Sequence, residues 1–130
     1  MRDHERLNRP VIVPLPAEID IANAEDVGEQ LRAAFAPGVT VVIADLGSTV
    51  FCDSSGARQL VLAHKRAVVS NRELLVVTSS AGVLRALAIL GLDRVLEIYP
   101  DLAAALATRP APGGQGYVPA DTSCVLAVLS

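Results

Sequence analysis

The stretch Val50-Phe51-Cys52-Asp53-Ser54-Ser55-Gly56 joins an apolar segment to a helical pattern and decides how this chain folds. Upstream, residues 39–46 form an apolar and largely β-branched run, as expected of a strand covered on both faces. Downstream, from about residue 56 to residue 70, apolar residues recur at helical spacings. We therefore expect Asp53-Ser54-Ser55-Gly56 to lie where a strand segment ends and a helix begins.

Strand-like and helix-like segments alternate along the rest of the chain. Alternation at this spacing predicts an α/β fold with a largely parallel sheet of four to five strands and about four helices. Pro14 lacks an amide donor, so we expect the first strand to be short or to lie at a sheet edge. The predicted strands cover residues 11–15, 39–46, 74–78 and 94–99, and the predicted helices cover about residues 20–35, 56–70, 80–90 and 102–107.

Composition and charge exclude several classes of function. The chain has 130 residues, which suits one domain, and 52% of them are apolar. A net charge of -3 without a basic stripe argues against direct nucleic-acid binding. No stretch reaches the ~18 apolar residues of a membrane span, and the charged N-terminus has no signal-peptide core. We therefore expect a cytoplasmic protein without membrane insertion.

The domain boundaries follow from shifts in composition. We expect a loose N-terminal segment at residues 1–9, a folded domain at residues 10–108, and a Pro/Gly-rich tail with an apolar end at residues 109–130. Cys52 and Cys124 show no metal-ligand spacing, so no metal site is predicted. Cys52 reads as a small buried apolar residue.

Ser54 and Ser55 place two hydroxyls at a helix start, where backbone N–H groups lack helical partners. The positive end of the helix dipole tolerates added negative charge there. One interpretation is a phosphorylation switch, and the alternative is a plain helix cap. The preceding helix has two candidate caps of the same kind, Asp20 and Asn23.

Catalysis by these serines is not expected. The chain has no G-x-S-x-G elbow to activate Ser54 or Ser55. His64 lies ten residues after Ser54, or ~15 Å along a helix, which is beyond hydrogen-bond reach. No Walker loop or dinucleotide glycine pattern is present, so no enzymatic activity and no cofactor are predicted.

The segment Phe51-Cys52-Asp53-Ser54-Ser55-Gly56 resembles the signature of STAS domains, in particular bacterial anti-sigma factor antagonists. Glu18-Ile19-Asp20, followed by Ala24 and Leu31, resembles the segment of that family that leads into its first helix. Leu90-Gly91-Leu92, with the strand to Ile98, resembles the family's third helix and last strand. The resemblance extends from Val11 to Ala107.

The resemblance implies a phospho-switched binding module acting in sigma-factor regulation. Ser54 would be phosphorylated by a partner anti-sigma factor that is itself a serine kinase, and a PP2C-type phosphatase would reset it. The unphosphorylated form would bind the kinase and release a sigma factor. Arg58, one turn after Ser54, is a candidate partner for the phosphate. The predicted partner-binding residues are Asp20, Asn23, Asp53, Ser54, Ser55, Gly56 and Arg58.

A second role within the same family stays open. A STAS docking subunit of another complex, such as a lipid-transport ABC system, would use the same surface without phospho-switching. The chain also departs from the family pattern at Ala17 and at Ala57-Arg58, and residues 1–9 read poorly as the strand that usually precedes residue 11. These departures bear on the identity of the partner more than on the fold.

Overall fold

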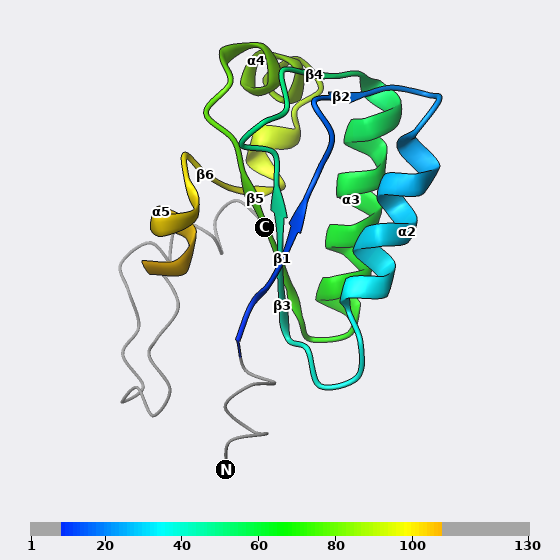
Figure 1. The fold of residues 1–130 in the computed structure, drawn as a ribbon, viewed down its shortest axis with the longest axis vertical. Coiled ribbons are helices and arrows are strands. Elements are labelled where there is room, and N and C mark those ends of the chain that lie inside the picture. The colour runs from blue at the N-terminus through cyan, green and yellow to red at the C-terminus, as the bar shows by residue number, and fades with distance from the viewer. Residues whose placement is uncertain (1–8, 108–130) are drawn as a thin grey trace.

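A computed structural model describes residues 9–107 of the chain. Their main feature is a parallel four-stranded sheet in the order β1-β3-β5-β6, with helices on both sides (Figure 1). This confirms the predicted α/β class. The elements are β1 (Val11–Pro14), β2 (Glu18–Ile19), α2 (Ala24–Ala34), β3 (Val41–Asp45), β4 (Phe51–Cys52), α3 (Ser54–Val69), β5 (Glu73–Val77), α4 (Ala81–Ile89), the 3-10 helix η1 (Leu92–Arg94), β6 (Glu97–Tyr99) and α5 (Leu102–Ala107).

The central strands β3 and β5 send alternate side chains into two separate apolar layers. Val42 and Val76 join the larger core cluster, to which α2, α3 and α4 also contribute buried residues. Ile43 and Leu75 face the other way and pack with Ala105 of α5. Both faces of these strands are therefore covered, which explains why their sequences are almost continuously apolar.

Pro14 and Gly91 each occupy a position that suits their backbone chemistry. Within the described residues β1 pairs with β3 alone, so Pro14 lies on an edge strand where its missing amide donor is tolerated. Gly91 adopts a left-handed conformation with φ 76° just after α4 and turns the chain into η1. A residue with a Cβ would be strained in this conformation.

The sequence reading missed a second, smaller sheet. Glu18–Ile19 was predicted to be part of a turn into the first helix, but these residues form β2 and pair in parallel with β4 at Phe51–Cys52. Ile19 and Cys52 are buried, whereas Glu18 and Phe51 are exposed. The two-stranded sheet holds the chain that enters α2 beside the chain that enters α3.

Two further details of the prediction were wrong. Residues 94–99 do not form one strand, because the chain completes η1 before β6 begins. Helix α3 begins at Ser54 rather than near Gly56. On α4 the buried residues are Val83 and Leu87, while Leu84 and Leu90 are exposed.

The predictions for the N-terminal segment and the C-terminal tail lie outside the described residues, apart from those for residues 9 and 10. This includes the question of a strand before residue 11. Among the residues that the structure describes, no helix combines the length and apolar character needed to cross a bilayer.

Candidate functional site

Asp53 is the N-cap of helix α3, in an extended backbone conformation directly after β4. Its Oδ1 accepts hydrogen bonds from the backbone amides of Ser55 at 2.9 Å and Gly56 at 3.2 Å. Burial of the carboxyl opposes its ionised form, but hydrogen bonds from the Ser55 hydroxyl and from the amides of Gly56, Ser55 and Ile21 outweigh this effect. They hold the pKa of Asp53 below its ordinary value. The carboxylate is therefore the structural cap of this helix.

The two serines after the cap have different environments. The Ser55 side chain is half-buried and bonds to the Asp53 carboxylate. Ser54 is the first residue of α3 and is exposed, and among the described residues its hydroxyl has no hydrogen-bond partner. The hydroxyl available to a visiting protein is thus that of Ser54.

Gly56 lets the start of α3 pack closely against the small β2–β4 sheet. A Cβ at this position would lie 2.5 Å from Ile19 Cγ2 and 2.8 Å from Cys52 Sγ, closer than side-chain carbons approach such atoms. Both neighbours are buried, and burial together with the charge of Asp53 raises the pKa of the Cys52 thiol to about 11. The start of α3, which carries Ser54, is therefore held in place by close packing against the β2–β4 sheet.

The turn after β2 lies next to this helix start. The Asp53 amide donates to the Ile19 carbonyl at 3.1 Å, and the Ile21 amide bonds to the Asp53 carboxylate. The structure therefore places the predicted Asp20 turn beside Ser54. Helix α4 also contacts β4, which brings the Ser79–Ser80 turn to the same end of the sheet (Figure 1).

The capping role predicted for Asp20 or Asn23 is wrong. Asn23 occupies the N-cap position of α2, but its side chain makes no capping bond. Asn23 Oδ1 instead accepts from the Asp20 amide at 3.0 Å, and Asn23 Nδ2 donates to the Glu18 carbonyl at 2.8 Å. Asp20 Oδ1 accepts from the Ala22 amide at 2.9 Å. Both side chains bond to the turn itself, which competes with capping and makes the turn rigid.

Three large apolar side chains are exposed on the segments next to Asp53. Ile21 is 83% exposed, Val50 is 65% exposed and Phe51 is 50% exposed. We call these three residues the apolar rim. They adjoin Asp53 through the chain and through the β2–β4 pairing. Large exposed apolar side chains gathered around a polar centre are typical of a protein–protein interaction site.

The family model that matches this chain is that of the STAS domain, over residues 2–105. The chain belongs to the STAS domain family. A search of curated proteins finds no matching relative. The family assignment accounts for the order of strands and helices, and the residues of the predicted signature occupy the helix start described above.

Several solved structures share this fold. An anti-sigma factor antagonist from Mycobacterium paratuberculosis is 25% identical, with a TM-score of 0.68 over 75% of this chain and 82% of that chain. A sulfate transporter family protein from Wolinella succinogenes is 18% identical, with a TM-score of 0.67 over 75% and 82% of the two chains. The phosphorylated form of the Bacillus cell fate determinant SpoIIAA is 20% identical, with a TM-score of 0.58 over 77% and 91%.

Arg58 and His64 follow Ser54 on α3. Arg58 is exposed one turn after Ser54, and no ion pair of its guanidinium occurs within the described residues. His64 is buried, and burial followed by the nearby charge of Lys65 lowers its pKa. No group of three His, Cys, Asp or Glu side chains within residues 9–107 is arranged to hold a metal ion.

Sequence reasoning overlooked two contributors to the site of this STAS domain. Thr49 is 1% exposed, and its Oγ1 donates to the Pro16 carbonyl at 2.8 Å, which ties the segment before β4 to the segment before β2. Ile21, the most exposed member of the apolar rim, was not predicted because it lies in a turn of mostly polar residues. An isolated large apolar residue between Asp20 and Asn23 was the signal that could have revealed it.

Proposed function

We propose that this STAS domain is an anti-sigma factor antagonist whose unphosphorylated form binds an anti-sigma factor serine kinase and so releases a sigma factor. Phosphorylation of Ser54 ends the binding, and a PP2C-type phosphatase restores it. The observation that carries the proposal is the state of Ser54, which is exposed while Asp53 caps the helix and Ser55 bonds to that cap. The fold shared with phosphorylated SpoIIAA supports the same role.

A phosphate on Ser54 is compatible with the folded domain. It adds about -1.5 to -2 charge at neutral pH. At the first residue of α3 it meets the positive end of the helix dipole, which favours negative charge. Asp53 keeps its capping bonds, because they do not involve the Ser54 side chain. The main effect of phosphorylation therefore falls on the interface and not on stability.

The interface changes because the phosphate appears beside existing negative charge. The Asp53 carboxylate is the neighbouring residue, and hydrogen bonds keep it ionised. A kinase surface that fits Ser54 and the apolar rim would then face a dianion next to a carboxylate. Unfavourable charge juxtaposition in an interface costs several kcal/mol, so we expect the affinity to fall by about 100-fold or more.

Arg58 is proposed as the phosphate's partner after transfer. It lies four residues after Ser54 on α3, a spacing at which helical side chains meet. Arg58→Ala would then accelerate reversal by the phosphatase and leave the unphosphorylated complex intact. An unchanged dephosphorylation rate in Arg58→Ala would remove Arg58 from the scheme.

In this role the domain is a substrate and binder that needs no cofactor of its own. The kinase supplies ATP and Mg²⁺. His64 does not serve as a base for Ser54, because it is buried and lies ten residues further along the same helix. The proposed site of action is the cytoplasm, where sigma factors act.

A docking subunit without phospho-switching is the second candidate. Two observations favour it: the apolar rim is exposed, and the fold is shared with a sulfate transporter family protein. Such a subunit would hold its partner whether or not Ser54 carried a phosphate.

Intact-mass measurement and peptide mapping of the protein from its own cells distinguish the two functions. A phospho-switch predicts one phosphate, retained in Ser55→Ala and absent in Ser54→Ala. The matched pair matters because the two serines are adjacent and differ in exposure. Two results together would favour the docking subunit and contradict the switch. Ser54 would be unmodified in growth, stationary phase and stress, and the Ser54→Asp variant would still form a stable complex with the partner protein.

A further inference from the structure

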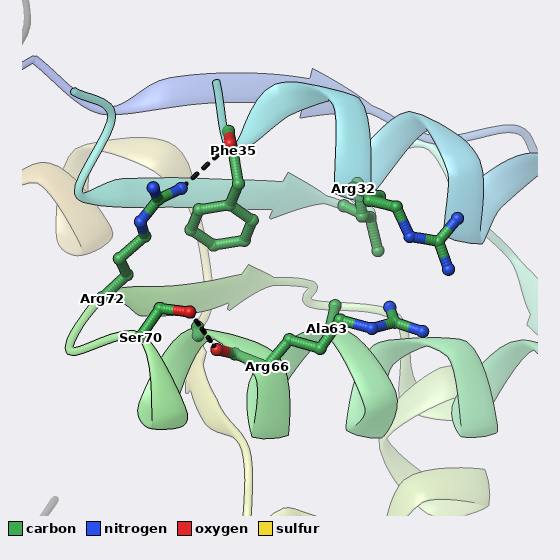
Figure 2. A pocket seen from close by; sticks show the side chains of 8 residues that line it. Arg32, Phe35, Ala63, Arg66, Ser70 and Arg72 are labelled. Atoms are coloured by element: carbon green, nitrogen blue, oxygen red, sulfur yellow. Dashed lines mark hydrogen bonds between the residues drawn. The ribbon is translucent and has the colours of Figure 1, made fainter. Parts of the chain in front are cut away.

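At the opposite end of α3 from Ser54, a pocket of about 160 Å³ lies between the C-terminal turns of α2 and α3 (Figure 2). Ser54 begins α3, and the pocket residues Arg66 and Ser70 lie at its end, so the two sites are ~20 Å apart along the helix. Six residues define what we call the arginine pocket: Leu31, Arg32, Phe35, Ala63, Arg66 and Arg72.

The pocket combines an apolar floor with cationic walls. Leu31 and Ala63 are buried in the main core, and the Phe35 ring is partly buried against it. The guanidinium groups of Arg32 and Arg66 lie on one side of that ring, one from each helix, and Arg72 approaches from the other side (Figure 2). Three arginines therefore line one pocket in a chain whose net charge is -3.

Arg72 has a structural task. Its Nη1 donates to the Phe35 carbonyl at 2.9 Å, and its guanidinium carbon lies 5.7 Å from the centre of the Phe35 ring. These contacts fix the ring and close one side of the pocket. Arg72 is therefore a positioning residue rather than the main contact for a ligand.

Arg32 and Arg66 remain able to bind an anion. Arg32 is paired with Glu29 at 2.7 Å, but this pair is one turn apart on an exposed helix face, where such pairs contribute little. Within the described residues no ion pair or hydrogen bond occupies the Arg66 guanidinium. Both groups can form the paired N–H contacts that arginine makes with a carboxylate.

The helix ends do not repel an anion as strongly as bare helix C-termini would. A helix C-terminus carries partial negative charge on its last carbonyls. Here the Phe35 carbonyl accepts from Arg72, and the Arg66 carbonyl accepts from the Ser70 amide at 3.1 Å and from the Ser70 hydroxyl at 2.9 Å. The carbonyls nearest the pocket are thus satisfied within the protein.

We propose that the arginine pocket binds a small carboxylate with a flat apolar body, which lies against Phe35 while Arg32 and Arg66 hold its carboxylate. The volume is too small for a nucleotide, since pockets for drug-sized ligands measure about 300 Å³ or more. The apolar floor favours a carboxylate with an apolar body over inorganic phosphate. This inference does not depend on the function proposed for Ser54.

Three probes separate the contributions of charge and apolar surface. Benzoate has both, benzamide keeps the ring without the charge, and inorganic phosphate has charge without the ring. In amide-proton NMR titrations of the full chain, benzoate should cause saturable shifts confined to residues 31–36 and 63–72. Benzamide and phosphate should bind about tenfold more weakly or worse.

Two matched variants on α3 test the contact. Arg66→Gln should weaken benzoate binding about tenfold, because it removes a charge-assisted contact. Lys65→Gln removes the same charge from the neighbouring exposed position, which does not line the pocket, and should leave benzoate binding unchanged. Phe35→Leu keeps an apolar side chain without the ring and should also weaken it.

Several outcomes would overturn the proposal. Benzoate shifts that fail to saturate, or that spread over the whole domain, would show that no site exists. Equal affinities for benzoate and phosphate would contradict the assigned ligand class. Equal losses in Arg66→Gln and Lys65→Gln would reduce the effect to overall charge. The NMR spectrum of each variant shows in the same experiment whether the fold is intact.

Discussion

Replacing Gly56 by Ala tests whether the helix that carries Ser54 is held in place by close packing. The added Cβ would lie 2.5 Å from Ile19 Cγ2 and 2.8 Å from Cys52 Sγ. Ordinary carbon contacts begin near 3.4 Å, so the atoms must separate by almost 1 Å. Neither neighbour can move outward easily, because Ile19 and Cys52 are buried and paired in the β2–β4 sheet.

The expected loss of stability combines two opposing effects. Insertion of an extra methyl into a packed core destabilises by about 1–3 kcal/mol. Alanine is a better helix former than glycine, which offsets up to about 1 kcal/mol. The net loss for Gly56→Ala is then about 1–2 kcal/mol, equivalent to a fall in Tm on the order of 5–10 °C for a domain of this size.

Gly82→Ala is the matched control. Gly82 also lies in the first turn of a helix, α4, but a Cβ there would meet only the Val50 carbonyl oxygen at 3.5 Å and Ser80 Oγ at 3.8 Å. These are ordinary contacts, so helix propensity dominates and Tm should stay level or rise. Thermal unfolding by circular dichroism and urea titration measure both variants under the same conditions.

The double variant Gly56→Ala/Cys52→Ala identifies the contact responsible. Removing the sulfur relieves one of the two close approaches, so Gly56→Ala should cost less in the Cys52→Ala background. A Tm for Gly56→Ala equal to that of the unchanged protein would refute the packing argument. An equally large loss in the Cys52→Ala background would assign the whole cost to Ile19 and would show that Cys52 plays no part.

Three further predictions concern residues that hold the site. The pKa of Asp53 is lowered in the folded state, so its ionised carboxylate stabilises the fold well above pH 3.8, and this contribution is lost as the pH falls through the folded-state pKa. Asp53→Asn removes this contribution, so the Tm of the variant should fall less steeply with decreasing pH than the Tm of the unchanged protein. In a Cys124→Ser background, Cys52 should resist alkylation at pH 8, because a pKa of about 11 leaves only about a thousandth of the thiol ionised. Alkylation at the rate of a free cysteine would contradict this. Thr49→Val should destabilise by about 1–2 kcal/mol in urea titration, since it leaves the Pro16 carbonyl without its donor, and an unchanged midpoint would show that water replaces the bond.

The parts of the fold that sequence predicts well depend on long, uniform patterns. The continuous apolar runs of β3 and β5 reflect strands covered on both faces, and a strand of this kind has few alternatives. The start of α3 was visible to within two residues, because Asp53 is a strong cap followed by small residues. Element order and the approximate helix start therefore followed from local chemistry, whereas the choice of Ser54 over Ser55 came from the family resemblance.

The parts that sequence does not predict depend on contacts between distant segments. Strands β2 and β4 have two residues each, too few for a period of two to be recognised, and they pair across more than thirty positions. Asn23 illustrates a second limit: a polar residue before a helix has the chemistry of a cap, but only the fold shows that it bonds to the turn instead. The arginine pocket likewise joins the ends of α2 and α3, at Ala34 and Val69, which are far apart in the sequence.

The separation of cap and acceptor explains how a helix start can serve as a switch without endangering the fold. If the capping oxygen belonged to the serine that receives the phosphate, each transfer would remove a capping bond and each reversal would restore it. In this domain Asp53 provides the cap and the Ser55 hydroxyl bonds to it, so the Ser54 side chain takes no part in capping the helix. Close packing of Gly56 against the β2–β4 sheet holds the same helix start in place. Under the proposed function, phosphorylation of Ser54 would change the surface that a partner meets while the backbone beneath it stays fixed, which a reversible binding switch requires.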